Sequence, residues 1–143
     1  MSWLTNFQLN IAPNKCFSLN LASPYLVHSP DTFYINNSAI ESKTMVKDLG
    51  IYVTNNLKWA THINYICRNA SFCSYQLMKC VKSNNIFTLI HLYKTYVRPK
   101  IEFNCSVWSP WLSKDINKIE SIQRKFTKFA FNRCNIPFHS YIG

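Results

Sequence analysis

The spacing of apolar residues along the chain changes once, near residue 55. Before that point, short apolar runs such as CFSLNL (16–21) and TFYIN (32–36) lie between prolines, a pattern typical of strands and turns. Beyond it, apolar residues recur every three or four positions, the spacing of one helix face. The pattern predicts an α+β fold with two parts: a small antiparallel strand and hairpin part, 1–54, and a helical region, 55–143, with three helices.

Two stretches of the first part carry specific predictions. In TFYINNSAI the Asn36-Asn37 pair can adopt the positive φ of a tight turn, so residues 32–41 are predicted to form a hairpin. The stretch KTMVKDLGIYV, 43–53, is predicted to be the next strand, with Gly50 on its outer face, where another backbone could approach closely. Residues of the other parity would face the core: Met45, Leu49, Ile51 and Val53.

The second part is predicted to contain helices at 59–82, 86–108 and 113–132. The apolar face of the first helix consists of Ile63, Ile66, Ala70, Cys73, Leu77 and Val81. Pro99 lies inside the second helix and removes a backbone donor there, at a cost of about 3 kcal/mol, so we expect a kink or break near Arg98. Ser113 is the expected N-cap of the third helix, and Asp115 lies in its positive first turn.

The third helix separates apolar from basic residues. At about 100° per residue, one side of the helix carries Leu112, Ile116, Ile119, Phe126 and Ala130. The opposite side carries Lys114, Lys118, Lys125 and Lys128. A solvated charged face and a phosphate-binding stripe both account for this pattern.

The charge distribution bears on that choice. The chain has a net charge of +10, and residues 46–143 hold all of it, with fourteen basic and four acidic groups. Charge that only keeps a small protein soluble would have no reason to be placed so unevenly. The imbalance therefore favours a polyanionic partner.

The sequence offers few groups for catalysis. Its six acidic residues show no DD, DxD or ExxE spacing that could hold metal ions, and its six cysteines include no CxxC pair. Two glycines cannot form a glycine-rich phosphate loop. We predict no catalytic residue, metal, cofactor or small-molecule substrate for this chain, and reduced, mostly buried cysteines.

Aromatic and basic residues interleave in LYKTYVRPK (92–100) and WSPWLSK (108–114). Such mixtures can stack on bases while Lys and Arg contact phosphate. Tyr93 and Trp108, however, lie on the apolar stripe of the predicted second helix, so we expect them in the core. No apolar leader follows Met1 and no run of about 18 apolar residues occurs, which predicts an intracellular protein without a membrane span.

Four stretches together resemble the C-terminal part of reverse transcriptases of non-LTR retrotransposons, the jockey-like elements in particular. They are WLTNFQLNIAPNKC (3–16), KDLGIYVTNNLKWATHI (47–63), LYKTYVRPKIEFNCSVWSPW (92–111) and KDINKIESIQRKFTKFAF (114–131). They occur in the family's order and at its approximate spacing. The phrases VRPKIEF, VWSPW and IESIQRKFTK are specific as a set.

The resemblance implies a hairpin at the end of the polymerase palm, the primer grip, formed here by Lys47, Asp48, Leu49 and Gly50. It also implies that the following helices form a thumb that holds an RNA/DNA template-primer duplex by its backbone. The candidate contacts are Lys58, Arg68, Lys79, Lys82, Lys94, Arg98, Lys100, Lys114, Lys118, Lys125 and Lys128.

In the complete family enzyme, aspartates of upstream palm motifs bind Mg²⁺, and this chain contains none of those motifs. The resemblance therefore implies a fragment of an RNA-directed DNA polymerase that is inactive alone. An alternative is a stand-alone basic helical module that binds nucleic acid or protein. Membrane association through the amphipathic segment 113–132 is a weaker alternative, because its apolar face is needed for packing.

Overall fold

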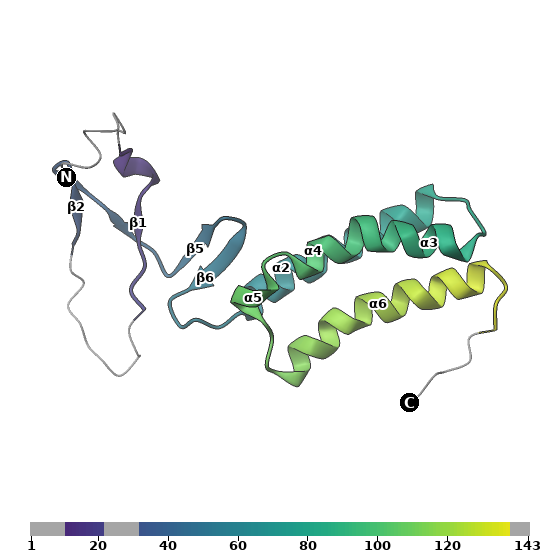
Figure 1. Ribbon diagram of the computed structural model, residues 1–143. Helices are drawn as coiled ribbons and strands as arrows, with labels where there is room; N and C mark the ends of the chain where they lie inside the picture. Colours follow the sequence, from purple (N-terminus) through teal and green to yellow (C-terminus); the bar gives the residue numbers. More distant parts are fainter. Residues whose placement is uncertain (1–10, 22–31, 138–143) are drawn as a thin grey trace. The chain divides into compact units, whose positions relative to one another are not determined.

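The computed structural model describes residues 11–21 and 32–137 (Figure 1). The chain has an α+β fold in which short strand pairs precede three main helices. It divides into two compact units, Met1–Lys58 and Trp59–Gly143, called here the strand unit and the helical unit. Two of the prolines between the apolar runs, Pro24 and Pro30, and the part of the resemblance that falls on 3–10 lie outside the described residues.

The described part of the strand unit contains one short 3₁₀ helix and three two-stranded ladders. The 3₁₀ helix η1 (Pro13–Lys15) precedes β1 (Phe17–Ser18), which pairs in parallel with β4 (Glu41–Ser42). The other two ladders are antiparallel: β2 (Tyr34–Ile35) with β3 (Ser38–Ala39), and β5 (Met45–Asp48) with β6 (Ile51–Thr54). The parallel β1–β4 pair departs from the all-antiparallel prediction.

The hairpin predicted at 32–41 is confirmed. Asn36 and Asn37 connect β2 to β3 with φ values of 50° and 60°. Both residues of a two-residue type I′ turn need positive φ, which asparagine tolerates better than most residues. This turn was therefore predictable from its two side chains.

The prediction of one continuous strand over 43–53 is wrong. Leu49 and Gly50 form a second two-residue turn, with φ values of 44° and 89°, that reverses the chain between β5 and β6. The reversal breaks the predicted parity, since Ile51 is buried whereas the Leu49 side chain is 82% exposed and Met45 is 43% exposed. Gly50 is explained by its positive φ and not by a close approach of another backbone.

The first predicted helix is confirmed as α2 (Ala60–Cys80). Its buried residues are His62, Ile63, Ile66, Cys67, Ala70 and Ser74. Cys73, Leu77 and Val81, which the spacing placed on the core face, are only half-buried. The core face is thus turned slightly toward Cys67 and Ser74.

The second predicted helix is irregular, as expected, but ends sooner. At the start of the α3 helix (Ile86–Leu92), the Asn85 side chain accepts a 2.9 Å hydrogen bond from the Phe87 amide. The helix continues through a π-helical turn, η2 (Tyr93–Val97), into α4 (Arg98–Glu102). The irregularity lies directly before Pro99, where the Arg98 amide donates to the Tyr93 carbonyl. The helix does not reach residue 108, because Asn104 adopts a left-handed conformation (φ 51°) before the short α5 (Cys105–Trp108).

The third predicted helix is confirmed as α6 (Ser113–Arg133). Its first turn contains Asp115, as predicted, and this side chain is buried. The N-cap prediction is wrong, because Leu112 occupies that position and no side chain caps the helix. Ser113 is instead the first helical residue.

The core of the helical unit brings these helices together. Leu89 of α3 packs with Phe126 and Ala130 of α6, and the Tyr93 ring lies 4.9 Å from the Phe126 ring. Trp108 is 2% exposed and its Nε1 donates a 2.8 Å hydrogen bond to the Phe103 carbonyl. The prediction that Tyr93 and Trp108 belong to the core is confirmed.

At the far end of the same unit, the Arg133 guanidinium joins α6 to the end of α2. It donates to the Met78 carbonyl at 3.2 Å and also to the Val81 carbonyl. These are carbonyls that a helix end leaves without an intrahelical donor. Within the described residues, none of the helices has the length and apolar character needed to cross a membrane.

Candidate nucleic-acid interface

The four residues predicted for the primer grip lie at the tip of the β5–β6 hairpin. Lys47 and Asp48 end β5, and Leu49 and Gly50 form the turn. All four are exposed. Lys47 lies opposite Tyr52 in the ladder, with its Nζ 5.3 Å from the ring centroid, so a cation and an aromatic ring share one face of the hairpin.

The eleven residues predicted to contact the nucleic-acid backbone are all exposed in the structure. One follows the β5–β6 hairpin, three belong to α2 and the loop after it, three to the η2–α4 segment and four to α6: Lys58, Arg68, Lys79, Lys82, Lys94, Arg98, Lys100, Lys114, Lys118, Lys125 and Lys128. Exposure is necessary for phosphate contact but does not select among them.

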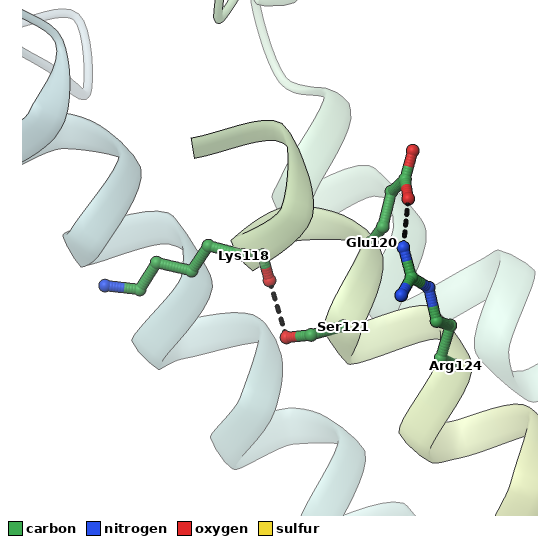
Figure 2. Close-up of polar contacts among 4 residues, drawn as sticks. All are labelled: Lys118, Glu120, Ser121 and Arg124. Atoms are coloured by element: carbon green, nitrogen blue, oxygen red, sulfur yellow. Dashed lines mark hydrogen bonds and ion pairs between the residues drawn. The ribbon is translucent and has the colours of Figure 1, made fainter. Parts of the chain in front are cut away.

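Ion pairing does distinguish some of the basic residues. Arg98 pairs with Glu102 at 2.6 Å, and the hydrogen bond that the guanidinium donates to this carboxylate raises the pKa of Arg98. Arg124 pairs with Glu120 at 2.5 Å, as Figure 2 shows. Both pairs join residues four apart on an exposed helix face, where such pairs add little stability.

The acidic groups of the helical unit are thus largely neutralised. Its three acidic residues are Glu102, Glu120 and Asp115, of which the first two are ion-paired and the third is buried. Of the twelve Lys and Arg residues between 59 and 137, Arg98 and Arg124 take part in those pairs, which leaves ten without an ion pair in this range. The exposed charge of the unit is therefore almost entirely positive.

The predicted orientation of α6 needs a correction. Leu112 and Ile116 are 45% and 37% exposed, whereas the buried side is formed by Asp115, Ile122, Phe126 and Ala130. At 100° per residue, the helix is rotated by about 45° from the predicted orientation. The rotation brings one edge of the basic side of α6 against α2. This basic side, called here the lysine stripe, consists of Lys114, Lys118, Lys125 and Lys128.

Lys118 is the residue that this rotation moves into a contact. Its Nζ donates to the Asn64 Oδ1 of α2, and in Figure 2 the side chain points away from the Glu120–Arg124 pair. Its carbonyl also accepts a 2.7 Å hydrogen bond from Ser121 Oγ. Burial raises the pKa of the Cys67 thiol, and the charge of Lys118 opposes that shift. Lys118 thus joins two helices, unlike Lys114, Lys125 and Lys128.

Sequence reasoning missed a second group of exposed residues, on α2. Tyr65, Arg68, Phe72, Tyr75 and Lys79 follow one another at steps of three and four, so they share one helix face, called here the α2 stripe. Phe72 is 62% exposed and Tyr75 is 54% exposed. The Lys79 Nζ lies 5.1 Å from the Tyr75 ring centroid.

The α2 stripe adjoins α6 at Tyr75. A hollow of about 290 Å³ lies there between the two helices, with Ser71, Lys125 and Phe129 in its lining. Lys125 of the lysine stripe and Tyr75 of the α2 stripe therefore line the same hollow. Basic and aromatic side chains from two helices meet on one surface of the helical unit.

A larger apolar groove of about 660 Å³ runs between the α3–η2–α4 segment and α6. Its lining includes the core residues Tyr93, Trp108 and Phe126. Lys94 and both partners of the Arg98–Glu102 pair also belong to the lining, so the groove carries charges of both signs. It is less suited to a polyanion than the surface around the α2 stripe.

Groups capable of acid–base or metal chemistry are not assembled in the described part of the chain. No three His, Cys, Asp or Glu side chains there are grouped so that they could hold a metal ion. His62 is buried against the Trp108 ring, at 5.3 Å between centroids, and burial lowers its pKa. It is a core residue.

The six cysteines form no disulfide, and the prediction that most are buried is wrong. Cys67 alone among the six is buried, while Cys80 and Cys105 are exposed and the rest are intermediate. Cys105 directly follows the helix break at Asn104.

Comparison with known proteins identifies a relative but no family. No protein-family model matches the chain, and no solved structure matches it. The chain is similar to uncharacterized protein B0403.1 of Caenorhabditis elegans, with 30% identity over 96 residues, which cover 67% of this chain and 48% of that protein. The match thus spans about half of the relative's length, and its name carries no function.

Proposed function

We propose that the chain is the primer-grip and thumb part of a reverse transcriptase of the non-LTR retrotransposon type. In this role it binds an RNA/DNA template-primer duplex and performs no chemistry of its own. The proposal rests on the sequence resemblance and agrees with the order of elements, in which a hairpin that carries KDLG precedes a basic helical unit.

The structural observation that supports the primer-grip part of the proposal is the conformation and position of Leu49. A side chain with a Cβ atom costs about 1–2 kcal/mol in the left-handed region, and asparagine or glycine is preferred at this turn position. Leu49 nevertheless has φ 44° and is 82% exposed, so the strain is not offset by burial. What distinguishes Leu49 from other exposed leucines is its place at the tip of the hairpin that carries KDLG, where it can contact a bound partner, here the primer end.

The helical unit supplies the charge that such a partner needs. Ten basic residues in it lack an acidic partner within 59–137, and they are spread over α2, α6 and the segments between them. Contacts of this kind hold phosphates without reading the base sequence. Affinity should then fall steeply with salt, since each neutralised phosphate releases counterions.

Substitution of Leu49 tests the proposal directly. We expect Leu49→Asn to strengthen the hairpin by about 1 kcal/mol, because the strained turn is relieved, and to weaken binding of an RNA–DNA hybrid with a recessed DNA 3′ end. Fluorescence anisotropy with that probe and with a blunt hybrid of equal length measures the effect. Affinity for the blunt hybrid should not change.

Leu57 provides a matched control. It also has a positive φ, 52°, and is 52% exposed, but it lies in the turn after β6 and outside the hairpin tip. Leu57→Asn should therefore leave both affinities unchanged. The proposal fails if the two variants bind the recessed hybrid alike, or if wild-type affinity is flat between about 50 and 200 mM salt.

A second candidate is a stand-alone basic module that binds nucleic acid. The buried core within the helical unit favours it, since Leu89, Phe126 and Ala130 of this unit pack against one another. The DNA upstream of the coding sequence separates the two candidates. A palm coding region with paired aspartates, in frame or frameshifted, supports the polymerase part, and an unrelated promoter with clean exon boundaries supports the module.

A further inference from the structure

The α2 stripe exposes aromatic rings on the face of a helix that already buries its other side. The Ile63, Ile66 and Ala70 side chains of α2 are buried in the core, at 1%, 6% and 0% exposure. A helix at the surface of a protein normally directs polar residues outward. Phe72 and Tyr75 are directed outward instead, so the face they share is a second contact surface of α2.

The charges on this surface have one sign. The segment Ala60–Cys80 contains no acidic residue, and Arg68 and Lys79 have no ion pair among the described residues. Lys125 of α6 adds a third cation, in the lining of the hollow that Tyr75 also lines. The matching partner is therefore anionic along its length and offers flat groups to the rings.

Nucleic acid with unpaired bases has both properties. Bases stack on aromatic side chains with about 1–3 kcal/mol each, while Lys and Arg contact the intervening phosphates. A duplex hides its base faces and would use only the cations. We infer that the α2 stripe binds single-stranded nucleic acid by stacking unpaired bases on Phe72 and Tyr75, between Arg68 and Lys79.

This inference rests on the proposed function and extends it from the duplex to an unpaired strand. The stripe extends for about 21 Å from residue 65 to residue 79, at 1.5 Å per residue. That length accommodates a few nucleotides. The Lys79 Nζ lies over the Tyr75 ring, 5.1 Å from its centroid, so it is close enough to contact a phosphate next to a base stacked on this ring.

Substitution of Phe72 in the full-length chain is the test. Affinity is measured for a short labelled oligothymidylate and for an abasic strand with the same number of phosphates. We expect Phe72→Ala to weaken oligothymidylate binding at least about fivefold and to leave abasic-strand binding unchanged. Phe72→Tyr, which keeps a ring, should retain wild-type affinity for both probes.

Phe87 supplies the matched control, because it is 79% exposed on α3 and lies outside the stripe. Phe87→Ala should change neither affinity. A second variant, Phe72→Lys, removes the ring and adds a cation, so it should weaken oligothymidylate binding and strengthen abasic-strand binding. Circular dichroism of each variant verifies that the helices are intact.

Several outcomes would overturn the inference. One is that Phe72→Ala and Phe87→Ala bind oligothymidylate with equal affinity. Another is that Phe72→Ala loses as much affinity for the abasic strand as for oligothymidylate. A third is that the wild-type chain binds polyglutamate or anionic lipid vesicles more tightly than oligothymidylate. A chain that binds the hybrid duplex but no oligothymidylate would overturn this inference and leave the proposed function standing. A chain that binds neither would overturn both.

Discussion

The strand unit and the helical unit differ in how they bury apolar side chains. Each element of the helical unit, from α2 to α6, contributes at least one buried apolar residue. In the described part of the strand unit, Ile51 is the only apolar residue that reaches this degree of burial. Its three ladders are separate and have only two strands each.

This difference indicates where the stability of the chain resides. Isolated two-stranded ladders are marginal in water, whereas a helical unit with a shared core can unfold cooperatively. The strand unit also exposes large side chains, among them Phe33 at 57% and Tyr34 at 65%. Under the proposed function, these apolar surfaces would pack on the remaining palm of a complete polymerase.

The largest expected effect breaks the core of the helical unit. Trp108→Ala should lower the free energy of unfolding by about 3–5 kcal/mol, because it leaves a cavity beside His62 and removes the hydrogen bond to the Phe103 carbonyl. Urea unfolding followed by circular dichroism measures it. Trp111→Ala, at a position that is 81% exposed, should change the value by less than about 0.5 kcal/mol.

An intermediate effect is expected from pH, again through the helical unit. Burial lowers the pKa of His62, so below its ordinary value of 6.5 the unfolded chain binds a proton that the folded chain does not. Stability should therefore fall as pH drops below about 6.5, by at most about 1.4 kcal/mol per pH unit from this group. His62→Gln should make the free energy of unfolding, measured with urea at each pH, less dependent on pH in this range. The prediction is contradicted if this free energy falls equally with pH in the wild type and in the variant.

The smallest expected effect is confined to one ladder of the strand unit. Gly50→Ala places a Cβ at φ 89° and should weaken the β5–β6 hairpin by about 1 kcal/mol. Hydrogen exchange should accelerate for amides of Met45–Asp48 and Ile51–Thr54 only. Asn37→Ala should act in the same way on β2–β3, and a response shared by both hairpins would show that the ladders are coupled after all.

The positions of the helices along the chain were predictable from the spacing of apolar residues, but the helix that packs against each apolar face was not. Steps of three and four residues located α2 and α6 to within a few residues of their ends. Periodicity defines an apolar arc and does not identify the helix that covers it. The rotation of α6 and the contact between Lys118 and Asn64 therefore depended on the placement of α2, which no local pattern contains.

Two features of the candidate site could not be predicted from the residue pattern, for different reasons, although the resemblance implied a hairpin at Lys47–Gly50. The Leu49–Gly50 turn lacks the Asn or Asp that normally precedes glycine, so an alternating apolar pattern concealed it. The α2 stripe was hidden because aromatic residues at helical spacing are usually core. The informative signal was that the three aromatic residues of the stripe share its face with Arg68 and Lys79 and not with aliphatic residues.

The π-helical turn at 93–97 has a consequence for the whole second helix. The buried or half-buried residues Leu89, Tyr93, Val97 and Ile101 follow at intervals of four, whereas a regular helix completes a turn in 3.6 residues. Over three such intervals the apolar side would drift by about 120° around the axis. The π turn accommodates one extra residue and so resets the phase by about 100°, which keeps Leu89 and Ile101 on the same side. The helix can therefore follow one core from end to end although its sequence is spaced in fours.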